Sequence, residues 1–239
     1  VRITTMSDKG SKKTLGILGG MGAMAGASFY RRLVELTPAE NDQEHIRAVL
    51  YSNPGVPDRT EAILGRGEDP YPALLDSARI LEGAGAELIV MACVSAHYYI
   101  DSLRRDIETD ILSALEETAE AIKEDCPDGC GLGLMATTGT LRSNLFQPLL
   151  DGYHILTLPD DLQESLVMGA IYGELKAGRI TAGREKAVKA LDILRDMGAE
   201  AVIIGCSELP LVIDRRSTGI PVFDSMEILI RKAVSLCSG

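Results

Sequence analysis

The sequence predicts an α/β protein made of two similar lobes. Apolar runs of strand length alternate with segments of helical period along most of the chain. Two pairs of stretches are related: residues 85–93 (GAELIVMAC) match residues 198–206 (GAEAVIIGC) without a gap, and residues 15–20 (LGILGG) are echoed by residues 132–137 (LGLMAT). A strand, turn and helix pattern that occurs twice indicates a duplicated architecture.

Cys93 and Cys206 hold matched positions at the ends of the repeated strands. If the two lobes face each other across a cleft, both thiols reach one bound molecule from opposite sides, as a two-base proton exchange at carbon requires. The alternative is that both are buried structural residues, since a free cysteine packs as a small hydrophobic side chain. Because the two positions match within a repeat, we favour a chemical role.

The composition is that of a globular chain with a large acidic excess. Its 239 residues, 46% hydrophobic and 25% charged, can bury the core of one large or two small domains. A formal charge of -11 without a basic stripe argues against a nucleic-acid partner. A small anionic substrate would then need specific arginine or lysine residues in its pocket. No apolar run reaches the length of a membrane span, so we expect none.

The five cysteines show no paired spacing, which favours reduced thiols and a cytoplasmic protein. Cys126 and Cys130 flank a Pro-Asp-Gly turn, but no second cluster of cysteine or histidine completes a zinc site. We therefore expect no metal, and we assign a structural role to these two residues and to Cys237. Residues 1–13 are polar and mixed in charge, and we expect a mobile leader there.

The first half of the chain opens with a strand, a glycine turn and a helix. The strand is predicted at residues 14–18 and the helix at residues 23–35. Residues 20–25 (GMGAMA) satisfy a dinucleotide-binding fingerprint, which makes a nucleotide-dependent oxidoreductase an alternative. That fingerprint also requires an acid at the end of the second strand, whereas the strand predicted at residues 48–51 is followed by Ser-Asn-Pro. Dinucleotide binding is therefore disfavoured.

Arg59 is the best-placed guanidinium of the first half, because it follows the second strand at the expected carboxyl edge of the sheet. It can bind an anion or brace the short helix after it, and the sequence leaves both roles open. Helices are predicted at residues 71–82 and, after the strand that ends at Cys93, at about residues 96–105. His97 could act as a base, but we favour a packing or orienting role.

The second half repeats this order. A helix at residues 111–124 precedes a strand at residues 129–135. Ala-Thr-Thr-Gly-Thr then replaces the glycine turn, and its hydroxyl and N–H groups at a helix N-terminus make a ready carboxylate site. Further helices are predicted at residues 141–150, 162–176 and 185–196, and a strand at residues 154–158. Lys176 ends the long helix, where a cation suits the helix dipole or a substrate carboxylate.

The last strand, at residues 221–225, and the last helix, up to residue 236, find no partner within the second half. We expect both to return to the first lobe. The predicted domains are therefore residues 14–110 plus 222–239 for the first lobe and residues 111–221 for the second.

Together these stretches resemble the cofactor-independent aspartate/glutamate racemases, and within them the aspartate racemase branch. The resemblance covers nearly the whole chain from Lys13 onward. The matching stretches are GGMGAMA at 19–25, DQEHI at 42–46, SNP at 52–54, PDRT at 57–60, Cys93 with AHY at 96–98, ATTGT at 136–140, Lys176, and GCSELP at 205–210. Glutamate racemases usually carry His-Tyr-Pro after the second cysteine motif. This chain has Glu-Leu-Pro there, which places it on the aspartate side.

The resemblance implies two Rossmann-like lobes related by pseudo-twofold symmetry, with the active site in the cleft between them. It also implies an amino-acid racemase for aspartate, glutamate or both that uses no cofactor, binds a small anionic amino acid and forms a homodimer. Cys93 and Cys206 look like the acid/base pair, and Arg59 and Lys176 look like the clamp on the side-chain carboxylate. The residues that look like pocket residues for the α-carboxylate and amino group are Met21, Asn53, Ser95, Thr137, Thr138, Thr140 and Ser207.

Two positions depart from the family. The family commonly reads Cys-Asn-Thr at the first cysteine, where this chain has Val94 and Ser95, and Gly26 takes the place of a threonine after the glycine turn. Because valine cannot make the hydrogen bonds of an amide, this departure predicts weak turnover of aspartate or glutamate and a gain in a Val94→Asn variant. Two alternatives stay open: a superfamily isomerase or decarboxylase acting on a related carboxylate, and a binding protein with little turnover.

Overall fold

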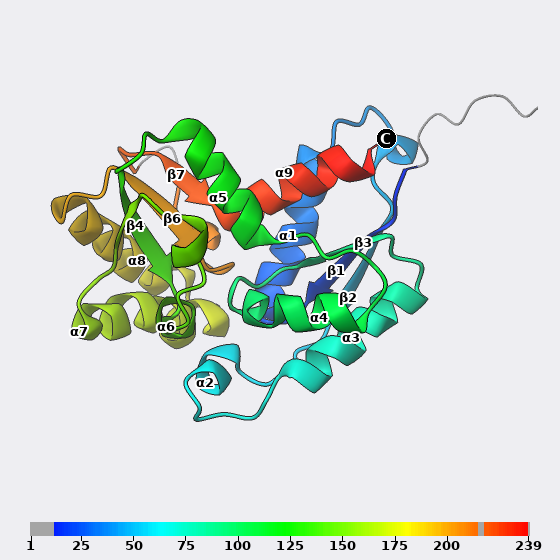
Figure 1. Cartoon of the computed structure of the whole chain (residues 1–239), viewed down its shortest axis with the longest axis horizontal. Coiled ribbons are helices and arrows are strands. Elements are labelled where there is room, and N and C mark those ends of the chain that lie inside the picture. The colour runs from blue at the N-terminus through cyan, green and yellow to red at the C-terminus, as the bar shows by residue number, and fades with distance from the viewer. Residues whose placement is uncertain (1–11, 215–217, 239) are drawn as a thin grey trace, which may run out of the picture.

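The computed structural model describes residues 12–214 and 218–238, which form two α/β lobes. In Figure 1 one lobe surrounds strands β1 to β3, the other surrounds β4, β6 and β7, and helix α9 runs from one to the other. All strand pairs in both sheets are parallel. The α/β class and the two-lobed arrangement predicted from the sequence are confirmed.

The first lobe contains a three-stranded sheet in the order β2-β1-β3. Strand β1 lies in the middle, and all five of its residues are buried. The elements of this lobe are β1 (Leu15–Gly19), α1 (Ala23–Leu36), η1 (Asp42–Glu44), β2 (Ala48–Ser52), α2 (Arg59–Ile63), α3 (Tyr71–Gly83), β3 (Leu88–Met91), η2 (Ser95–Tyr99) and α4 (Ile100–Asp106).

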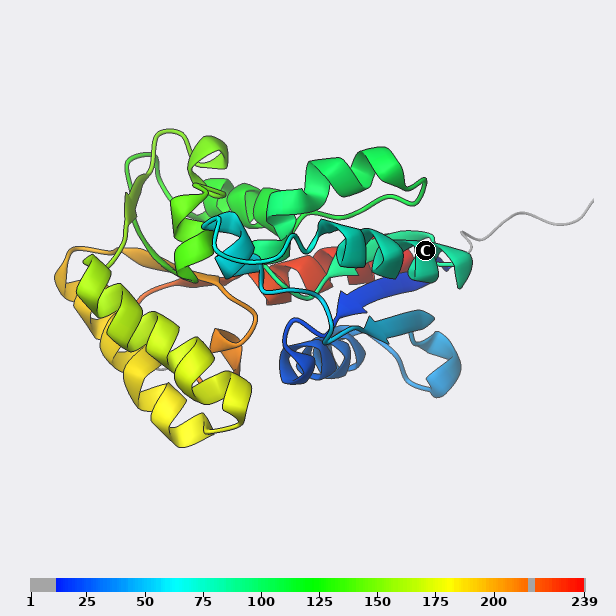
Figure 2. The ribbon, with the colours of Figure 1, turned by 90° about the horizontal axis from the view of Figure 1, so that it is seen from below.

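The second lobe contains a four-stranded sheet in the order β5-β4-β6-β7. Figure 2 shows η4 and α8 side by side as its outer layer. The remaining elements of the chain are α5 (Ala114–Asp125), β4 (Gly131–Ala136), α6 (Thr138–Arg142), η3 (Gln147–Leu149), β5 (His154–Leu156), α7 (Asp160–Leu162), the π-helix η4 (Gln163–Glu174), η5 (Leu175–Ala177), α8 (Ile180–Asp196), β6 (Ala201–Gly205), η6 (Leu209–Leu211), β7 (Val222–Asp224) and α9 (Ser225–Cys237).

The sequence repeat corresponds to a structural repeat. The order β2-β1-β3 in the first sheet is matched by β5-β4-β6 in the second, so that each cysteine follows a strand that neighbours the central strand of its lobe. In the first sheet Leu18 pairs with Met91, and in the second Ala136 pairs with Gly205. Because parallel strands end at the same edge of a sheet, the glycine or threonine turn and the cysteine turn of each lobe lie together.

Helix α9 ties the two lobes into one core. It packs against α1 of the first lobe and against α5, which precedes the second sheet. A single apolar cluster includes Leu15 of β1, Ile203 of β6 and Leu229 of α9, all fully buried. Separate clusters lie on the other face of each sheet, one under α3 and one under η4 and α8. The apolar core therefore continues from one sheet to the other, and it supports the strand ends of both lobes.

Strand β7 lies in the second lobe, and our expectation that it returns to the first lobe was wrong. It pairs in parallel with β6, from Val202 opposite Val222 to Ile204 opposite Asp224. A strand of three residues is too short to show a period that would reveal its neighbour. Helix α9 does contact the first lobe, as expected. The exact domain limits stay a prediction.

Two predicted helices are also interrupted. The helix expected at residues 141–150 is split into α6 and η3, with Asn144 between them at a positive φ of 51°. The helix expected at residues 162–176 is a succession of α7, η4 and η5 rather than one regular helix. The predicted mobile leader, residues 1–13, lies outside the described residues except for its last two positions. Within the described ranges, no helix is long and apolar enough to cross a membrane.

Candidate functional site

Cys93 and Cys206 line one cavity between the lobes. Cys93 follows β3 and Cys206 follows β6, and the two residues are equally buried, with 6% and 5% of their surface exposed. The free volume of the cavity is about 10 Å³, about enough for one water molecule. The prediction that the repeat brings two thiols to one cavity between the lobes therefore agrees with the structure.

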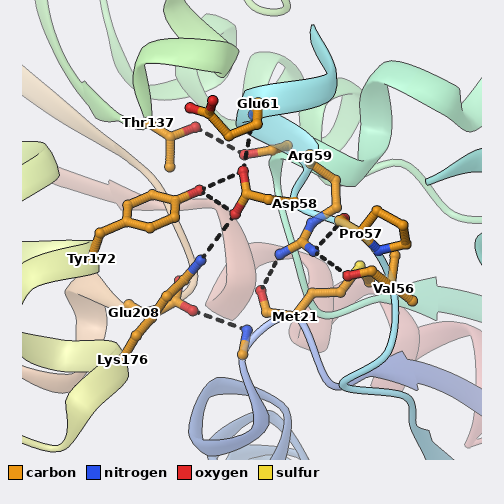
Figure 3. A network of polar contacts seen from close by, with 12 residues as sticks. Met21, Val56, Pro57, Asp58, Arg59, Glu61, Thr137, Tyr172, Lys176 and Glu208 are labelled. Carbon is orange, nitrogen blue, oxygen red and sulfur yellow. Dashed lines mark hydrogen bonds and ion pairs between the residues drawn. The ribbon is translucent and has the colours of Figure 1, made fainter. Parts of the chain in front are cut away.

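Cys206 faces a carboxylate. Its thiol donates a hydrogen bond to Oε2 of Glu208 over 3.1 Å, and the hydroxyl of Ser207 donates to the same oxygen over 3.2 Å. The other carboxylate oxygen accepts the backbone N–H of Gly22 over 3.0 Å, across the gap between the lobes (Figure 3). Burial raises the pKa of the Cys206 thiol well above its usual value, and the negative charge of Glu208 acts in the same direction.

Cys93 lies beside a buried cation, Arg59. The guanidinium donates to the backbone oxygens of Val56, Pro57 and Met21 over 3.1, 2.8 and 3.4 Å (Figure 3). Burial alone would lower the pKa of Arg59, but the acidic side chains nearby, with Cys93 contributing most, raise it above its usual value. Its Nε atom is buried and has no hydrogen-bond partner among the described residues.

The structure shows the bracing role of Arg59 and leaves its anion-binding role a prediction. Arg59 is the first residue of helix α2, and its contacts with preceding carbonyl groups brace the turn before that helix. The same guanidinium lines the cavity that holds both thiols. A buried cation with an unused N–H group is suited to bind an anion that enters the cavity.

Lys176 and Asp58 approach each other across the gap between the lobes. The ammonium of Lys176 lies 3.8 Å from Oδ2 of Asp58 and 3.7 Å above the ring of Tyr172. The Tyr172 hydroxyl donates to both oxygens of Asp58, over 3.1 and 2.8 Å (Figure 3). Asp58 also caps helix α2 by accepting the N–H of Glu61 over 3.0 Å.

These contacts determine the charge states of Asp58 and Tyr172, the two groups beside the Lys176 ammonium. Burial would raise the pKa of the Asp58 carboxyl, but the hydrogen bonds from Glu61 and Tyr172 and the Lys176 ammonium hold it below its usual value. Burial raises the pKa of the Tyr172 hydroxyl far above its usual value, which leaves it a neutral donor. In this state of the molecule Lys176 therefore faces an internal carboxylate.

Three hydroxyl groups form a buried cluster at one wall of the cavity. The Ser95 hydroxyl lies 3.0 Å from the hydroxyls of Thr137 and Thr140, which are themselves 3.2 Å apart. Thr137 also caps helix α6 by accepting the N–H of Thr140. Ser95 belongs to the first lobe and the threonines to the second, so this cluster also joins the lobes. Its hydroxyls can reorient to donate to a carboxylate.

Three of the predicted pocket residues do not line the cavity. Thr140 contributes its hydroxyl from behind Ser95 and Thr137. Thr138 turns its hydroxyl toward Glu164, over 2.6 Å. Asn53 donates to Ser77 and accepts from Gly55, and thereby shapes the turn next to the glycine turn. The predicted residues that do line it are Met21, Arg59, Cys93, Ser95, Thr137, Lys176, Cys206 and Ser207.

His97 has the orienting role that we favoured. Its ring is buried, with Nδ1 3.0 and 3.2 Å from the carbonyl oxygens of Cys93 and Val94. Nε2 accepts the N–H of Ala114, at the start of α5, over 3.0 Å. Because one nitrogen faces a donor and the other faces acceptors, the ring is neutral and protonated on Nδ1. Burial lowers the pKa of His97 to about 4, and the ring therefore holds the cysteine turn without supplying a base.

Val94 lies between the cavity and the apolar core. It lines the cavity next to Cys93, and it is also part of the apolar cluster that joins the two lobes, with 1% of its surface exposed. A polar side chain at this position would be placed largely among apolar groups. This placement changes what a Val94→Asn substitution is expected to do.

Sequence reasoning missed two side chains that line the cavity, Glu208 and Tyr172, and one beside it, Asp58. Glu208 stands two residues after Cys206, Asp58 stands beside Arg59, and Tyr172 lies one helical turn before Lys176. Their position next to predicted site residues could have drawn attention to them. Their partners could not be read from the sequence, because each bonds to a group in the other lobe.

Comparisons with known proteins agree on one family. A family model described as Asp/Glu/Hydantoin racemase matches residues 18–233. The aspartate racemase of Picrophilus torridus is 30% identical, with 93% of each chain covered and a TM-score of 0.83. An aspartate racemase homologue from Pyrococcus horikoshii OT3 is 28% identical over 95% of this chain and 100% of that chain, with a TM-score of 0.73. RacX of Bacillus subtilis (strain 168), a broad specificity amino-acid racemase, is 25% identical over 92% of this chain and 96% of the relative.

Proposed function

The chain belongs to the Asp/Glu/hydantoin racemase family, and we propose that it racemises aspartate, glutamate or both by proton exchange between Cys93 and Cys206, without a cofactor. The family predicted from the sequence is thereby confirmed. The observation that carries the mechanism is that two buried thiols from matched positions of the repeat line one small cavity. The cavity also holds the Arg59 guanidinium, the Lys176 ammonium and the hydroxyls of Ser95 and Thr137, which suit an amino acid with two carboxylates, and the Glu208 carboxylate, which faces Cys206.

The proposed reaction has two proton transfers. A thiolate on one side of the substrate takes the α-proton, so that the Cα–H bond breaks and an S–H bond forms. The electron pair left on the α-carbon is delocalised into the neighbouring carboxylate. The thiol on the other side then gives its proton to the opposite face of the carbon, which inverts the configuration and leaves that sulfur as the thiolate. Hydrogen-bond donors already aimed at the carboxylate stabilise the charge that develops there.

The cavity is lined by donors for two carboxylates. Ser95 and Thr137 offer hydroxyls, and a substrate α-carboxylate can replace their mutual hydrogen bond. Arg59 and Lys176 can clamp the side-chain carboxylate. To take part in this clamp, Lys176 exchanges its contact with Asp58 for the substrate. The relatives named above, an aspartate racemase, an aspartate racemase homologue and a broad specificity amino-acid racemase, support a small acidic amino acid as substrate.

The setting of the protein is also part of the proposal. We propose a cytoplasmic enzyme, because a mechanism with two thiols requires a compartment that keeps cysteines reduced. Each of the five cysteines is free, which supports this setting. We further propose a homodimer, with no nucleic-acid or membrane partner, in keeping with the acidic charge of the chain.

Proton exchange in deuterated water tests the proposal. The protein is incubated with L-aspartate or D-aspartate, and both the optical rotation and the deuterium content of the α-carbon are followed. We expect racemisation with deuterium in the product, and neither process in a Cys93→Ser/Cys206→Ser double variant. An unlabelled amino acid that is bound but unchanged would indicate a binding protein. Loss of a carboxylate or conversion of a non-amino acid only would indicate the isomerase or decarboxylase alternative.

A further inference from the structure

We propose that Glu208 holds the proton on Cys206, so that the resting enzyme presents Cys93 as the base and Cys206 as the acid. This inference rests on the proposed two-thiol mechanism. It assigns a positioning role to a residue outside the predicted site, and it removes the equivalence of the two cysteines.

Three donors converge on the Glu208 carboxylate. Oε2 accepts from the Cys206 thiol and the Ser207 hydroxyl, and Oε1 accepts from the Gly22 N–H. An ionised carboxylate offers acceptors only, which is what three donors require. The side chain is buried, with 4% of its surface exposed, so water does not screen its charge from the sulfur 3.1 Å away. Removal of the Cys206 proton would therefore place two negative charges in contact.

The other charged groups around Cys206 have partners of their own. Cys93 comes from the turn after β3, and a thiolate there would also repel a charge on Cys206. Arg59, from α2, is held by backbone carbonyls and lies beside Cys93. Lys176, from η5, contacts Asp58 and Tyr172. Of the charged side chains that line the cavity, Glu208 is thus the one that forms a direct hydrogen bond with the Cys206 sulfur.

The two thiols consequently stand next to opposite charges. Cys93 has a buried guanidinium beside it, and Cys206 has a buried carboxylate. Negative charge is better placed on Cys93 than on Cys206. In the resting state a substrate enantiomer whose α-proton faces Cys93 can react at once, and its carbanion takes the proton that Glu208 holds on Cys206. The Cys206 thiolate formed in this step lies against Glu208, which favours its reprotonation.

A Glu208→Gln variant separates the charge from the shape. The amide has nearly the same volume, and its oxygen can still accept the Gly22 N–H, so the link between the lobes is kept. Its NH₂ group then faces Cys206, where it favours a thiolate. The rate of alkylation by iodoacetamide is measured against pH for each cysteine separately, by peptide mapping, in the full-length protein without substrate.

In the wild type we expect Cys93 to react faster than Cys206 at pH 7, although the two are equally buried. In Glu208→Gln we expect the alkylation midpoint of Cys206 to move to lower pH. Its rate at pH 7 should rise about threefold for each pH unit of that shift, because a larger thiolate fraction outweighs the lower nucleophilicity. Glu208→Asp, which keeps the charge, should leave Cys206 slow.

Glu200→Gln is the matched control, because this glutamate also accepts a backbone N–H, from Gly131, but at the far end of β6. It should leave the Cys206 profile unchanged. An unchanged Cys206 midpoint in folded Glu208→Gln, or an equal shift of Cys93, would overturn the proposal. So would faster alkylation of Cys206 than of Cys93 in the wild type, a comparison that stands even if the variant fails to fold. Because alkylation needs no substrate, its outcome is independent of the deuterium-exchange test.

Discussion

Cys93 and Cys206 occupy equivalent positions in the repeat, yet their neighbours carry opposite charges. Arg59 approaches Cys93 from the segment after β2, whereas Glu208 approaches Cys206 from its own turn. A racemase needs one acid and one base at any moment, and it exchanges those roles after each turnover. Two residues of one chemical kind can serve in this way only if their surroundings assign the proton to one of them.

Serine substitutions at the two cysteines should stop racemisation without unfolding the protein. An alcohol at neutral pH is a far poorer base than a thiol, so Cys93→Ser and Cys206→Ser should each lower kcat about 10²- to 10⁴-fold. Each variant keeps one thiol, and that thiol can still remove and return the proton on its own face. In deuterated water each single variant should therefore label one enantiomer, and the two variants should label opposite ones. Full racemisation by either variant would contradict a two-thiol mechanism.

The Val94→Asn variant should lose stability. The resemblance to the family predicts a gain in activity from this change, but Val94 is part of the buried apolar cluster between the lobes. An amide without hydrogen-bond partners in such a place costs about 1–3 kcal/mol. Denaturant unfolding should show a loss of that size, with no tenfold gain in kcat/KM for aspartate. Val94→Ala, which also reduces apolar packing but adds no polar group, is the control that separates the two effects.

At the scale of residues, the sequence was sufficient to predict those site residues that directly follow a strand. The cysteines, Ser95 and Thr137 follow strand ends, and parallel strands bring those ends to one edge. Glu208 and Tyr172 could not be found in this way. Their importance depends on partners in the other lobe, and those distances depend on how the lobes pack.

At the scale of elements, the repeat was the most informative feature of the sequence. Strands β3 and β6 end one or two residues before the predicted cysteines, because an apolar run that is buried on both sides has little freedom of register. Short elements were less predictable. Strand β7 has three residues, and its pairing with β6 depends on which edge of a sheet is open. The break after α6 occurs at Asn144, whose positive φ a helical pattern of apolar residues does not reveal.

Helix α6 approaches helix α2 so closely that a methyl group between them should disturb the site. A Cβ atom on Gly139 would lie 2.8 Å from Cα of Thr60, a backbone atom of the other lobe. Alanine normally stabilises a helix relative to glycine, but here it has to push the two helices apart. We expect Gly139→Ala to lower kcat/KM for aspartate about 10- to 100-fold, because a shift of about 1 Å misplaces the hydroxyl cluster.

Gly83→Ala provides the matched control for this prediction. Gly83 ends helix α3, and a Cβ atom there would meet nothing within 4 Å. Gly83→Ala should therefore retain full activity and wild-type stability or slightly more, whereas Gly139→Ala should lose activity. Kinetics and thermal unfolding of the two variants measure this difference. Full activity of Gly139→Ala would show that α6 is not needed at its present distance from α2.

At the scale of the whole molecule, the lobes are joined both by a shared core and by polar pairs around the cavity. Helix α9 contacts both lobes, and Arg32 of α1 pairs with Glu227 of α9. The polar pairs that cross between the lobes include Gly22 with Glu208, Asp58 with Tyr172, and Ser95 with Thr137. Because the cavity holds about 10 Å³, an amino acid can enter only when some of these pairs separate.

His97 connects the first cysteine turn to the start of α5, and its titration should control the pH dependence of stability. Its folded pKa is about 4, below the unfolded value of 6.5, because burial disfavours the charged ring. Between these two values the unfolded chain binds a proton that the folded chain does not. The free energy of unfolding therefore falls as the pH decreases from 6.5 toward 4. Protonation of Nε2 would also break the hydrogen bond from Ala114.

We expect the wild type to lose about 2 kcal/mol of stability on this account between pH 7.5 and pH 5, because each pKa unit corresponds to about 1.4 kcal/mol. Denaturant unfolding at the two pH values measures the loss. A His97→Gln variant, whose amide oxygen can still accept the Ala114 N–H, should be less stable at pH 7.5 but should lose about 2 kcal/mol less than the wild type between the two values. The carboxylates titrate in both proteins, so their contribution cancels in the difference. If both proteins lose the same amount, the His97 ring is not the neutral link that joins the cysteine turn to the rest of the molecule.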